Sequence, residues 1–562
     1  MRAGTHAPRE QALRSDRRAT LVVAALALAL LAALLVHGRA WAFLCDDAYI
    51  SFRYAENLAE RGSLEFNPGL TPPERVEGYS NLLWVLLLAG GQRLGLSPPT
   101  LAPWLTTASS LAGLALVTLL VRALRQRFGA SPRWSPLDLS AALWLAALPE
   151  YAVWSQGGLE TSFALAWALA ATLAWTRDRP IVAAAAAALA GLTRQDSLLP
   201  IAGFGLVWIL VLGTPFIRAQ GPRRALQAIP WRRLAVALAV FIAPLLAQLL
   251  WRRHYYGAWL PNTWAIKAYG ALLRDSHGLP YLAAWVAGLG GAWLWALAPL
   301  AALVRARHLL LVAPAALVLA YAWSVGGDFM AYSRFLLVAT TLTAALVGWL
   351  ARDAYDLLRV KTSGWRRVAA SLLVTLAVAA LVAGTARRAR ARWRVDMATT
   401  EGWLDGRYEG ARAMDRFARI RVHAGAWMRE NLPQETWITV GAAGALPYAS
   451  GLRIIDAYGL VDPVVATTTK PHVGPRARPG HQLHASRAYL LSRDPDLLCH
   501  VGIVGRRRPG PADATRRGFR TGYAWACVDP GPASDPREPG GAFDPGYYCC
   551  LRPRGREVGP FR

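Results

Sequence analysis

Apolar residues are gathered into long uninterrupted runs along most of the chain, and short polar stretches separate the runs. Many of these runs have about the 20 residues that a helix needs to cross the hydrocarbon core of a bilayer. A soluble core does not explain so many unbroken runs. The pattern therefore predicts a polytopic α-helical membrane protein with eleven spans, at 20–43, 101–121, 137–155, 159–175, 180–193, 197–213, 234–251, 280–304, 309–326, 335–350 and 368–385.

The apolar run at 82–89 is left out of these spans because a polar stretch follows it after only eight residues. The distribution of basic residues supports this choice. With the N-terminus inside, the inside segments carry more than twice as many Lys and Arg residues as the outside loops before residue 386, as the positive-inside rule requires. Counting 82–97 as a span would turn the basic loop 218–233 outward. The pattern predicts a cytoplasmic N-terminus and a first outer loop at 44–100.

The chain after residue 385 is polar and rich in Pro and Gly, and it contains alternating strand and helix signals. Alternation of this kind predicts a small α/β domain at 386–529, and the eleven spans place it on the extracytoplasmic side. Residues 530–562 look loop-rich, and residues 1–19 look disordered. We expect the protein in the inner membrane of a bacterium.

Composition supports a membrane protein and argues against nucleic-acid binding. Of the 562 residues, 54% are hydrophobic and 24 are Trp, a residue that collects at bilayer interfaces. The net charge of +27 comes mainly from Arg residues between the apolar runs, where topology explains it. Four of the five cysteines lie in the outer tail, where one or two disulfides of undetermined pairing are expected; they are Cys499, Cys527, Cys549 and Cys550.

Two adjacent carboxylates, Asp46 and Asp47, follow the end of the first predicted span. Carboxylates at the edge of a bilayer are costly unless they are paired or used. A carboxylate fixed at the end of a rigid helix can act as a general base. A solvated span end would also explain the pair, and two such carboxylates could ligate a hard cation. The sequence leaves the dependence on a divalent cation open.

Polar and charged residues recur at the outer ends of the other spans, which would bring them to one face of the membrane. Plain alternatives exist for each group: a loop turn at Gly78, an ion pair between Arg194 and Asp196, and an interfacial aromatic belt near Tyr256. The collective pattern suits transfer from a membrane-bound phosphate ester, because cations stabilise a departing phosphate and a carboxylate activates a hydroxyl.

Several motifs taken together resemble one branch of the GT-C membrane glycosyltransferases. That branch includes the mycobacterial terminal β-arabinofuranosyltransferase and the flagellar motor control proteins. The ordered set covers roughly residues 40–500, and Gln195 stands where family members often have Pro. The motifs are DDAYISFRYA (46–55), FNPG (66–69), RVEGYSNLLW (75–84), GLET (158–161), LTR (192–194), YYG (255–257), LPNT (260–263), GGD (326–328), RF (334–335), GAAGALPY (441–448) and DAYGLVDP (456–463).

The resemblance implies a GT-C fold and an enzyme that transfers a sugar, such as arabinofuranose, from a polyprenyl-phosphate donor to a glycan of the cell envelope. It also implies that the catalytic acidic residue is Asp46 or Asp47. We expect Asp46 to be the base and Asp47 to orient or bind the substrate. A non-enzymatic membrane protein acting on the flagellar motor is the alternative. The expected phosphate-binding residues are Arg194, Lys267, Arg334 and Arg53, and the expected substrate-binding residues are Glu77, Tyr79, Asn81, Glu160, Asp196, Tyr256, Asn262 and Asp328.

Overall fold

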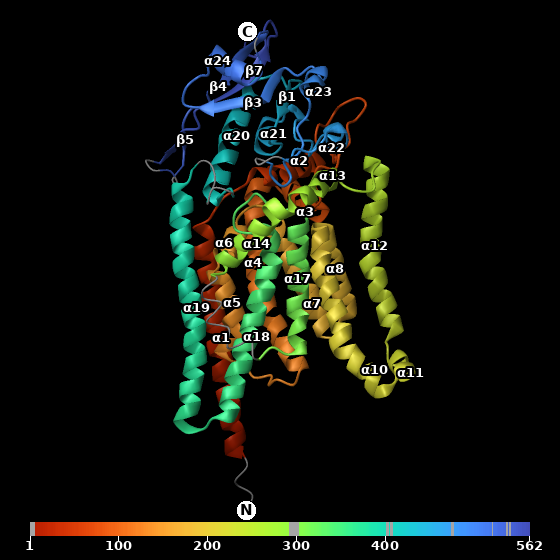
Figure 1. Ribbon diagram of the computed structural model, residues 1–562, viewed down its shortest axis with the longest axis vertical. Coiled ribbons are helices and arrows are strands. Elements are labelled where there is room, and N and C mark those ends of the chain that lie inside the picture. Colours follow the sequence, from red (N-terminus) through yellow and green to blue (C-terminus); the bar gives the residue numbers. More distant parts are fainter. Residues whose placement is uncertain are drawn as a thin grey trace, which may run out of the picture.

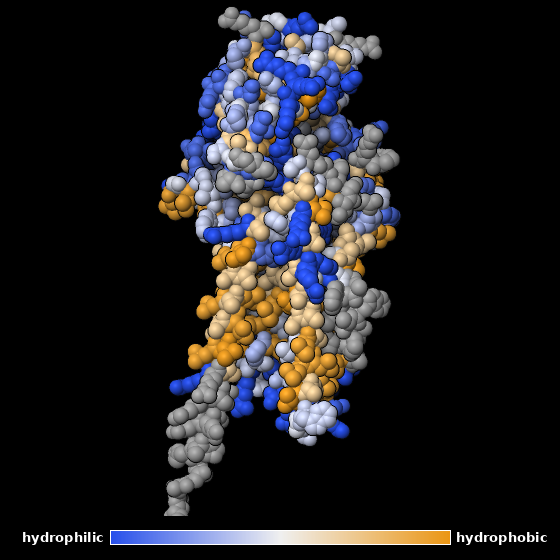
Figure 2. All heavy atoms as spheres, turned by 90° about the vertical axis from the view of Figure 1, so that its left-hand side faces the viewer, coloured by the Kyte–Doolittle hydropathy of each residue, from blue (hydrophilic) through white to orange (hydrophobic). Residues whose placement is uncertain are grey.

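The protein is a bundle of long helices with a mixed α/β domain stacked on one end, and the N-terminus lies at the opposite end (Figure 1). The computed structural model describes residues 6–290, 303–400, 404, 408–473, 477–519, 521–535, 538 and 541–561. Figure 2 shows apolar side chains gathered over the bundle and hydrophilic side chains over the α/β domain. This division is the one that a bilayer around the bundle and water around the domain would produce.

The helices before the α/β domain form the bundle and the segments at its ends. Their bounds are α1 (His6–Arg39), α2 (Asp46–Arg61), α3 (Leu82–Arg93), α4 (Pro98–Arg127), α5 (Ser140–Ala147), α6 (Pro149–Trp154), α7 (Thr161–Thr176), α8 (Pro180–Thr193), α9 (Leu198–Trp208), α10 (Thr214–Gln220), α11 (Pro222–Gln227), α12 (Trp231–Tyr256), α13 (Asn262–Ala268), α14 (Leu279–Gly288), α17 (Leu309–Ser324), α18 (Leu337–Lys361) and α19 (Gly364–Ala398).

Among the described residues, seven helical segments are long and apolar enough to cross a membrane, and each coincides with a predicted span. Three further predicted spans correspond to shorter apolar helices, at Pro136–Ala147, Thr161–Thr176 and Pro180–Thr193. The one predicted span that remains, at 280–304, begins with α14, and its later residues lie outside the described part of the chain. The excluded run is α3, a helix of 12 residues and about 18 Å that is similar in length to these shorter apolar helices, and its exclusion from the spans remains a prediction.

The α/β domain is built on a five-stranded sheet of order β2-β1-β3-β7-β4. β1 (Trp437–Val440) pairs in parallel with β2 (Arg453–Asp456) and β3 (Leu497–Gly505), whereas β7 (Tyr547–Pro553) is antiparallel to β3 and β4 (Tyr523–Val528). A short hairpin joins β5 (Ala533–Ser534) and β6 (Ala542–Phe543). The helices of the domain are α20 (Ala411–Asn431), α21 (Ala445–Ser450), α22 (Pro463–Thr468), α23 (Arg487–Ser492) and α24 (Pro511–Arg516).

Two expectations for the ends of the chain differ from the structure. Residues 530–562, expected to be loop-rich, supply β7, which pairs with strands on both sides of it. A strand of seven residues with adjacent cysteines gave no clear alternation of polar and apolar positions, which is why the sequence pattern missed it. Residues 6–19, expected to be disordered, continue α1 toward the N-terminus. Residues 1–5 lie outside the described part of the chain.

Two disulfides cross-link the sheet, Cys499–Cys550 and Cys527–Cys549. Successive side chains of a strand point to opposite faces, so the adjacent residues Cys549 and Cys550 on β7 reach different partners. The expectation of one or two disulfides is met by two. Disulfides persist in oxidising compartments, which suits a domain on the outer side of the membrane.

The first outer loop and the α/β domain are tied together by buried polar contacts. Arg53 on α2 donates to the carbonyl oxygens of Pro447 and Leu452, at 2.5 and 2.7 Å. Asn67 exchanges two hydrogen bonds with the backbone of Ile454, at 2.8 and 3.0 Å. Asp396, at the end of α19, accepts from the amides of Ala411 and Arg412 and so caps α20. These contacts hold the domain directly over one end of the helix bundle.

Candidate functional site

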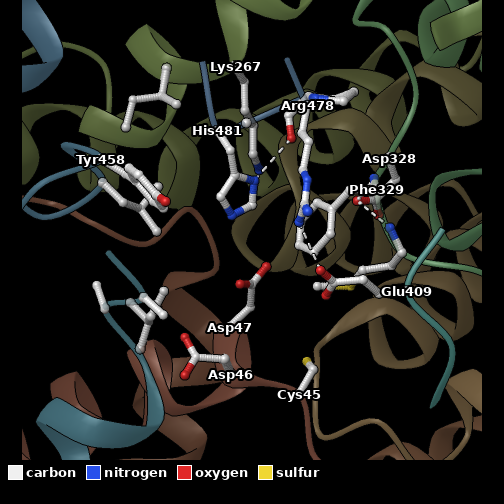
Figure 3. A pocket seen from close by; sticks show the side chains of 18 of the residues that line it. Cys45, Asp46, Asp47, Lys267, Asp328, Phe329, Glu409, Tyr458, Arg478 and His481 are labelled. Carbon is white, nitrogen blue, oxygen red and sulfur yellow. Dashed lines mark hydrogen bonds and ion pairs between the residues drawn. The ribbon is translucent and has the colours of Figure 1, made fainter. Parts of the chain in front are cut away.

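A cavity of about 390 Å³ lies where the α/β domain meets the helix bundle. Its membrane-side wall comes from the start of α2, from α13, and from the segment between α17 and α18. Its outer wall comes from the loops of the α/β domain. Figure 3 shows the charged and aromatic side chains that converge on it. Five of the residues predicted from the sequence line this cavity, namely Asp46, Asp47, Lys267, Asp328 and Arg334.

Asp46 is held by the α/β domain. Its carboxylate accepts hydrogen bonds from the backbone amides of Gly444 and Ala445, at 3.0 and 2.9 Å. A Cβ atom at Gly444 would lie 1.8 Å from the Asp46 carbonyl oxygen, so the close approach requires glycine there. Burial raises the pKa of Asp46 to about 6, although the charge of Arg421 and the two amides oppose the rise. Both carboxylate oxygens of Asp46 are therefore engaged by the backbone.

Asp47 turns toward the cavity instead, where Figure 3 places its carboxylate between Asp46 and His481. About a third of its side chain (36%) remains exposed, and its nearest cation is the Arg334 guanidinium at 4.0 Å. The surrounding protein raises the pKa of Asp47 by desolvation, and the positive charge of Arg334 opposes this. Asp47 is thus a carboxylate with a raised pKa and free space in front of it.

Arg334 enters the cavity from an unusual turn. Tyr332 and Ser333 both adopt left-handed backbone conformations, with φ of 63° and 47°, which are strained for residues other than glycine. The turn is held because the Tyr332 hydroxyl donates to Asp396 at 2.5 Å and the Trp154 indole donates to the Tyr332 carbonyl at 2.9 Å. The Arg334 guanidinium donates to Asp328 at 2.8 Å. Strain of this kind is typical of functional sites, and here it aims Arg334 at Asp47.

Lys267 on α13 lines the same cavity. Burial lowers the pKa of Lys267, and the positive charges of Arg194 and Arg334 lower it further. No other residue in the described part of the chain forms a hydrogen bond or an ion pair with the Lys267 amine. The Lys267 residue is exposed toward the cavity and lies near a second cation, so its amine is arranged to receive an anion.

Arg194 lies at a smaller void that shares Arg334, Tyr321 and Phe335 with the main cavity. Its guanidinium pairs with Glu160 at 2.8 Å and with Asp196 at 2.6 Å. The plain alternative, an Arg194–Asp196 ion pair at a tight turn, is therefore present. Because two carboxylates already neutralise it, Arg194 has less positive charge to offer a phosphate than Lys267 has.

The structure places the other predicted residues away from the lining of the main cavity, where they hold the outer segments together. Glu77 forms a buried ion pair with Arg252. Tyr79 and Tyr256 share a hydroxyl–hydroxyl hydrogen bond of 3.2 Å. Asn81 donates to Glu160 at 2.8 Å, and Asn262 donates to the Gly459 carbonyl at 2.7 Å. With Arg53, these residues position the loops that surround the cavity.

The lining residues that were not singled out from the sequence as site residues include Glu409, Tyr458, Arg478 and His481. Tyr458 lies inside one of the recognised motifs, so its position in the DAYGLVDP motif was the available signal. The other three come from irregular segments of the α/β domain, and no local pattern marks such segments as parts of a site.

The described residues contain no group of three or more His, Cys, Asp or Glu side chains placed to hold a metal ion. The adjacent pair Asp46 and Asp47 does not converge, because Asp46 turns to the backbone of the α/β domain. Between Asp47 and Asp328 lies the guanidinium of Arg334, which fills the position that a cation would take between those two carboxylates.

A helical bundle with several apolar spans and a C-terminal α/β domain matches the GT-C fold of the solved ArnT structure, so the predicted fold class is confirmed. The chain is similar to ArnT from Cupriavidus metallidurans in its crystal structure bound to undecaprenyl phosphate, with 15% sequence identity and a TM-score of 0.50 over 95% of this chain and 98% of that chain. The apo crystal structure of the same protein gives 13% identity and a TM-score of 0.49, covering 95% and 97% of the two chains.

Residues 411–534, within the α/β domain, match the family described as "Domain of unknown function (DUF8728)". A search of curated proteins finds no match to the chain. The likeness to ArnT is one of fold, and with the apolar spans it makes this chain a multi-pass membrane protein. The resemblance to the arabinofuranosyltransferase branch remains a prediction.

Proposed function

We propose that the protein is a glycosyltransferase that takes a sugar from a polyprenyl-phosphate donor and attaches it to a glycan acceptor on the outer side of the membrane. The observation behind the proposal is the cavity itself. It sets the Asp47 carboxylate opposite the cations Lys267 and Arg334, at the level where the spans end. A carboxylate for the acceptor and cations for a departing phosphate are the groups that this reaction needs.

Two smaller voids, of about 30 and 10 Å³, lie between the helices beside the cavity and mark a path for a lipid-linked donor. The second void shares Arg334 and Tyr321 with the main cavity. A third void shares Leu165, Pro200 and Val338 with the second and is lined almost wholly by apolar residues of α7, α9, α17 and α18. A phosphate at the cations would let an isoprenoid chain follow this path. The bound undecaprenyl phosphate of the ArnT crystal structure is consistent with such a ligand.

Asp47 is the general base in this proposal, and Asp46 positions it. Asp46 is engaged by two amides, whereas Asp47 faces open space. The acceptor hydroxyl oxygen bonds to the anomeric carbon while the bond from that carbon to the phosphate oxygen breaks. The hydroxyl proton passes to Asp47, and the electron pair of the broken bond leaves with the polyprenyl phosphate. Lys267 and Arg334 stabilise the negative charge that develops on that phosphate.

The sugar that we propose is a pentofuranose such as arabinofuranose, and the support for it is the ordered motif set. The test is a transfer assay with the full chain in lipid vesicles, using radiolabelled polyprenyl-phosphate sugars and cell-envelope glycan fragments. Transfer of label to a glycan supports the proposal. Absence of transfer from every polyprenyl-phosphate pentose and hexose would contradict it.

As the pH is lowered, the rate of transfer is expected to fall at a higher pH than it would if the base were a carboxylate of ordinary pKa. The base works only when deprotonated, and burial raises the pKa of Asp47 above the usual value of about 3.9. The acid limb of kcat/KM should therefore have an apparent pKa above about 4. The Asp46→Asn variant should keep this limb, since Asp46 is not the base. A limb at or below about 4 in the wild type would contradict the assignment.

The N-terminus is proposed to lie in the cytoplasm and the α/β domain outside. Alkaline phosphatase, which is active only after export, should be active when fused to the C-terminus and inactive when inserted into the loop at 128–136. The basic residues of the inside segments are the physical reason. The reverse pattern of activity would overturn the orientation without affecting the fold.

A further inference from the structure

The outer wall of the cavity differs in chemistry from the membrane-side wall. Glu409, Tyr458, Arg478, His481 and His484 line it, all from the α/β domain and the segment that leads into it. In contrast to the apolar third void between the helices, this wall is polar and aromatic. His484 is exposed, and Tyr458 and Arg478 are partly exposed, so the wall communicates with the aqueous side.

The rings of His481, Tyr458 and His484 contact one another in turn on this wall, and Phe329 from the membrane-side wall packs against His481. The His481 ring packs edge-on against Phe329, with ring centroids 4.6 Å apart, and against Tyr458 at 5.6 Å. Tyr458 also contacts His484, at 5.0 Å. One nitrogen of His481 lies 3.4 Å from the Pro479 carbonyl oxygen, and Figure 3 places the ring just above Asp47. Aromatic faces beside hydrogen-bonding groups suit a sugar ring, which has apolar faces and polar edges.

The charges on this wall are balanced. Arg478 pairs with Glu409 at 2.9 Å, with side chains 39% and 27% exposed. The carboxylate of Asp456 accepts from the amides of Tyr458 and Val461, at 2.9 and 3.0 Å. Burial keeps the pKa of His481 below its ordinary value, which favours the neutral ring at neutral pH. Among the described lining residues, the cation without a counter-ion is Lys267, on the donor side.

We infer that this outer wall is the acceptor subsite and that it binds a neutral, lipid-free saccharide that enters from the aqueous side. The terminal sugar ring lies against Tyr458, and one of its hydroxyl groups is held by the free nitrogen of His481 and presented to Asp47. The inference rests on the proposed function and specifies its acceptor. It separates the two substrates: the donor reaches the cavity through the bundle, and the acceptor reaches it through the α/β domain.

The test is a binding measurement that needs no catalysis. Saturation-transfer NMR is recorded on the full chain in nanodiscs with a panel of lipid-free neutral arabinan, galactan, glucan and mannan oligosaccharides. At least one oligosaccharide is expected to bind to the wild type. Tyr458→Leu and His481→Leu should each weaken that binding by at least about tenfold, the loss of one good contact. His481→Gln should restore part of it, because an amide can still hydrogen-bond a hydroxyl.

Two controls keep the outcomes separate. His472→Gln changes an exposed histidine outside the cavity lining and should leave binding within about twofold. Asp47→Asn should also keep binding, because the base is not needed for docking. Binding without any sugar transfer would contradict the proposed function and leave the subsite standing. The inference is overturned if no lipid-free saccharide binds, if only lipid-linked saccharides bind, or if folded Tyr458→Leu and His481→Leu proteins bind as well as the wild type.

Discussion

Replacing Asp47 with Asn is expected to lower the rate of sugar transfer by about 10²- to 10⁴-fold, the usual contribution of a general base. Asn has nearly the same shape and hydrogen-bonds similarly, but it cannot accept the acceptor's proton at neutral pH. The measurement is the initial rate of transfer in vesicles with both substrates saturating. The amount of protein, its thermal unfolding and its co-purified lipid should match those of the wild type, because Asp47 carries little of the packing and is 36% exposed.

Asp46→Asn is the matched control, because it makes the same chemical change one residue earlier. An amide oxygen can still accept from one of the two backbone amides that hold Asp46. We expect a loss of rate below about tenfold, together with a lower unfolding temperature because one charge-assisted hydrogen bond is lost. An inactive Asp46→Asn and an active Asp47→Asn would reverse the assignment and restore Asp46 as the base.

Replacing Lys267 with Met is expected to raise the KM for the lipid donor by about 10- to 100-fold, the effect of losing one hydrogen bond to a charged group. Met keeps the length and packing of the side chain but not its charge. Lys267 has no counter-ion among the described residues, so its removal leaves no buried carboxylate unpaired. The KM for the acceptor should stay within about twofold, since the acceptor binds at the opposite wall.

Arg274→Leu is the matched control for Lys267→Met. It removes a cation from the same outer segment, but Arg274 is exposed and pairs with Asp275 outside the cavity. Its donor KM should equal that of the wild type. If the donor KM of Lys267→Met equals that of the wild type, Lys267 is not part of the phosphate site. If both variants raise the donor KM equally, donor binding depends on the overall surface charge and not on Lys267 in particular.

The membrane architecture could be predicted from the sequence because span formation is a local property. A run of about 20 apolar residues crosses a bilayer whatever the rest of the chain does. The exclusion of the run at 82–89 remains a prediction that rests on the polar stretch after its short apolar segment. Two disulfides were harder to pair, because the alternation of Cys549 and Cys550 across β7 depends on a strand that the pattern did not indicate.

The site was only partly predictable because it depends on how α2 is rotated about its axis and on segments that are distant in sequence. Asp46 and Asp47 are consecutive on α2, and which of them faces the cavity is decided by how α2 packs against α21, nearly 400 residues away in sequence. Polar residues at span ends, such as Glu77 and Asn262, fit both a pocket and a structural tie, and only their partners distinguish the two. Glu409, Arg478 and His481 come from irregular segments without a local signal.

The identity of the lipid that remains bound to the purified protein tests the central claim most directly. Native mass spectrometry of the full chain, followed by release and fragmentation of the ligand, should identify a polyprenyl phosphate or its sugar adduct on the wild type. The Lys267→Met protein should retain much less of it. A wild-type protein that carries phospholipids but no polyprenyl phosphate, even after incubation with added polyprenyl phosphate, would contradict the account.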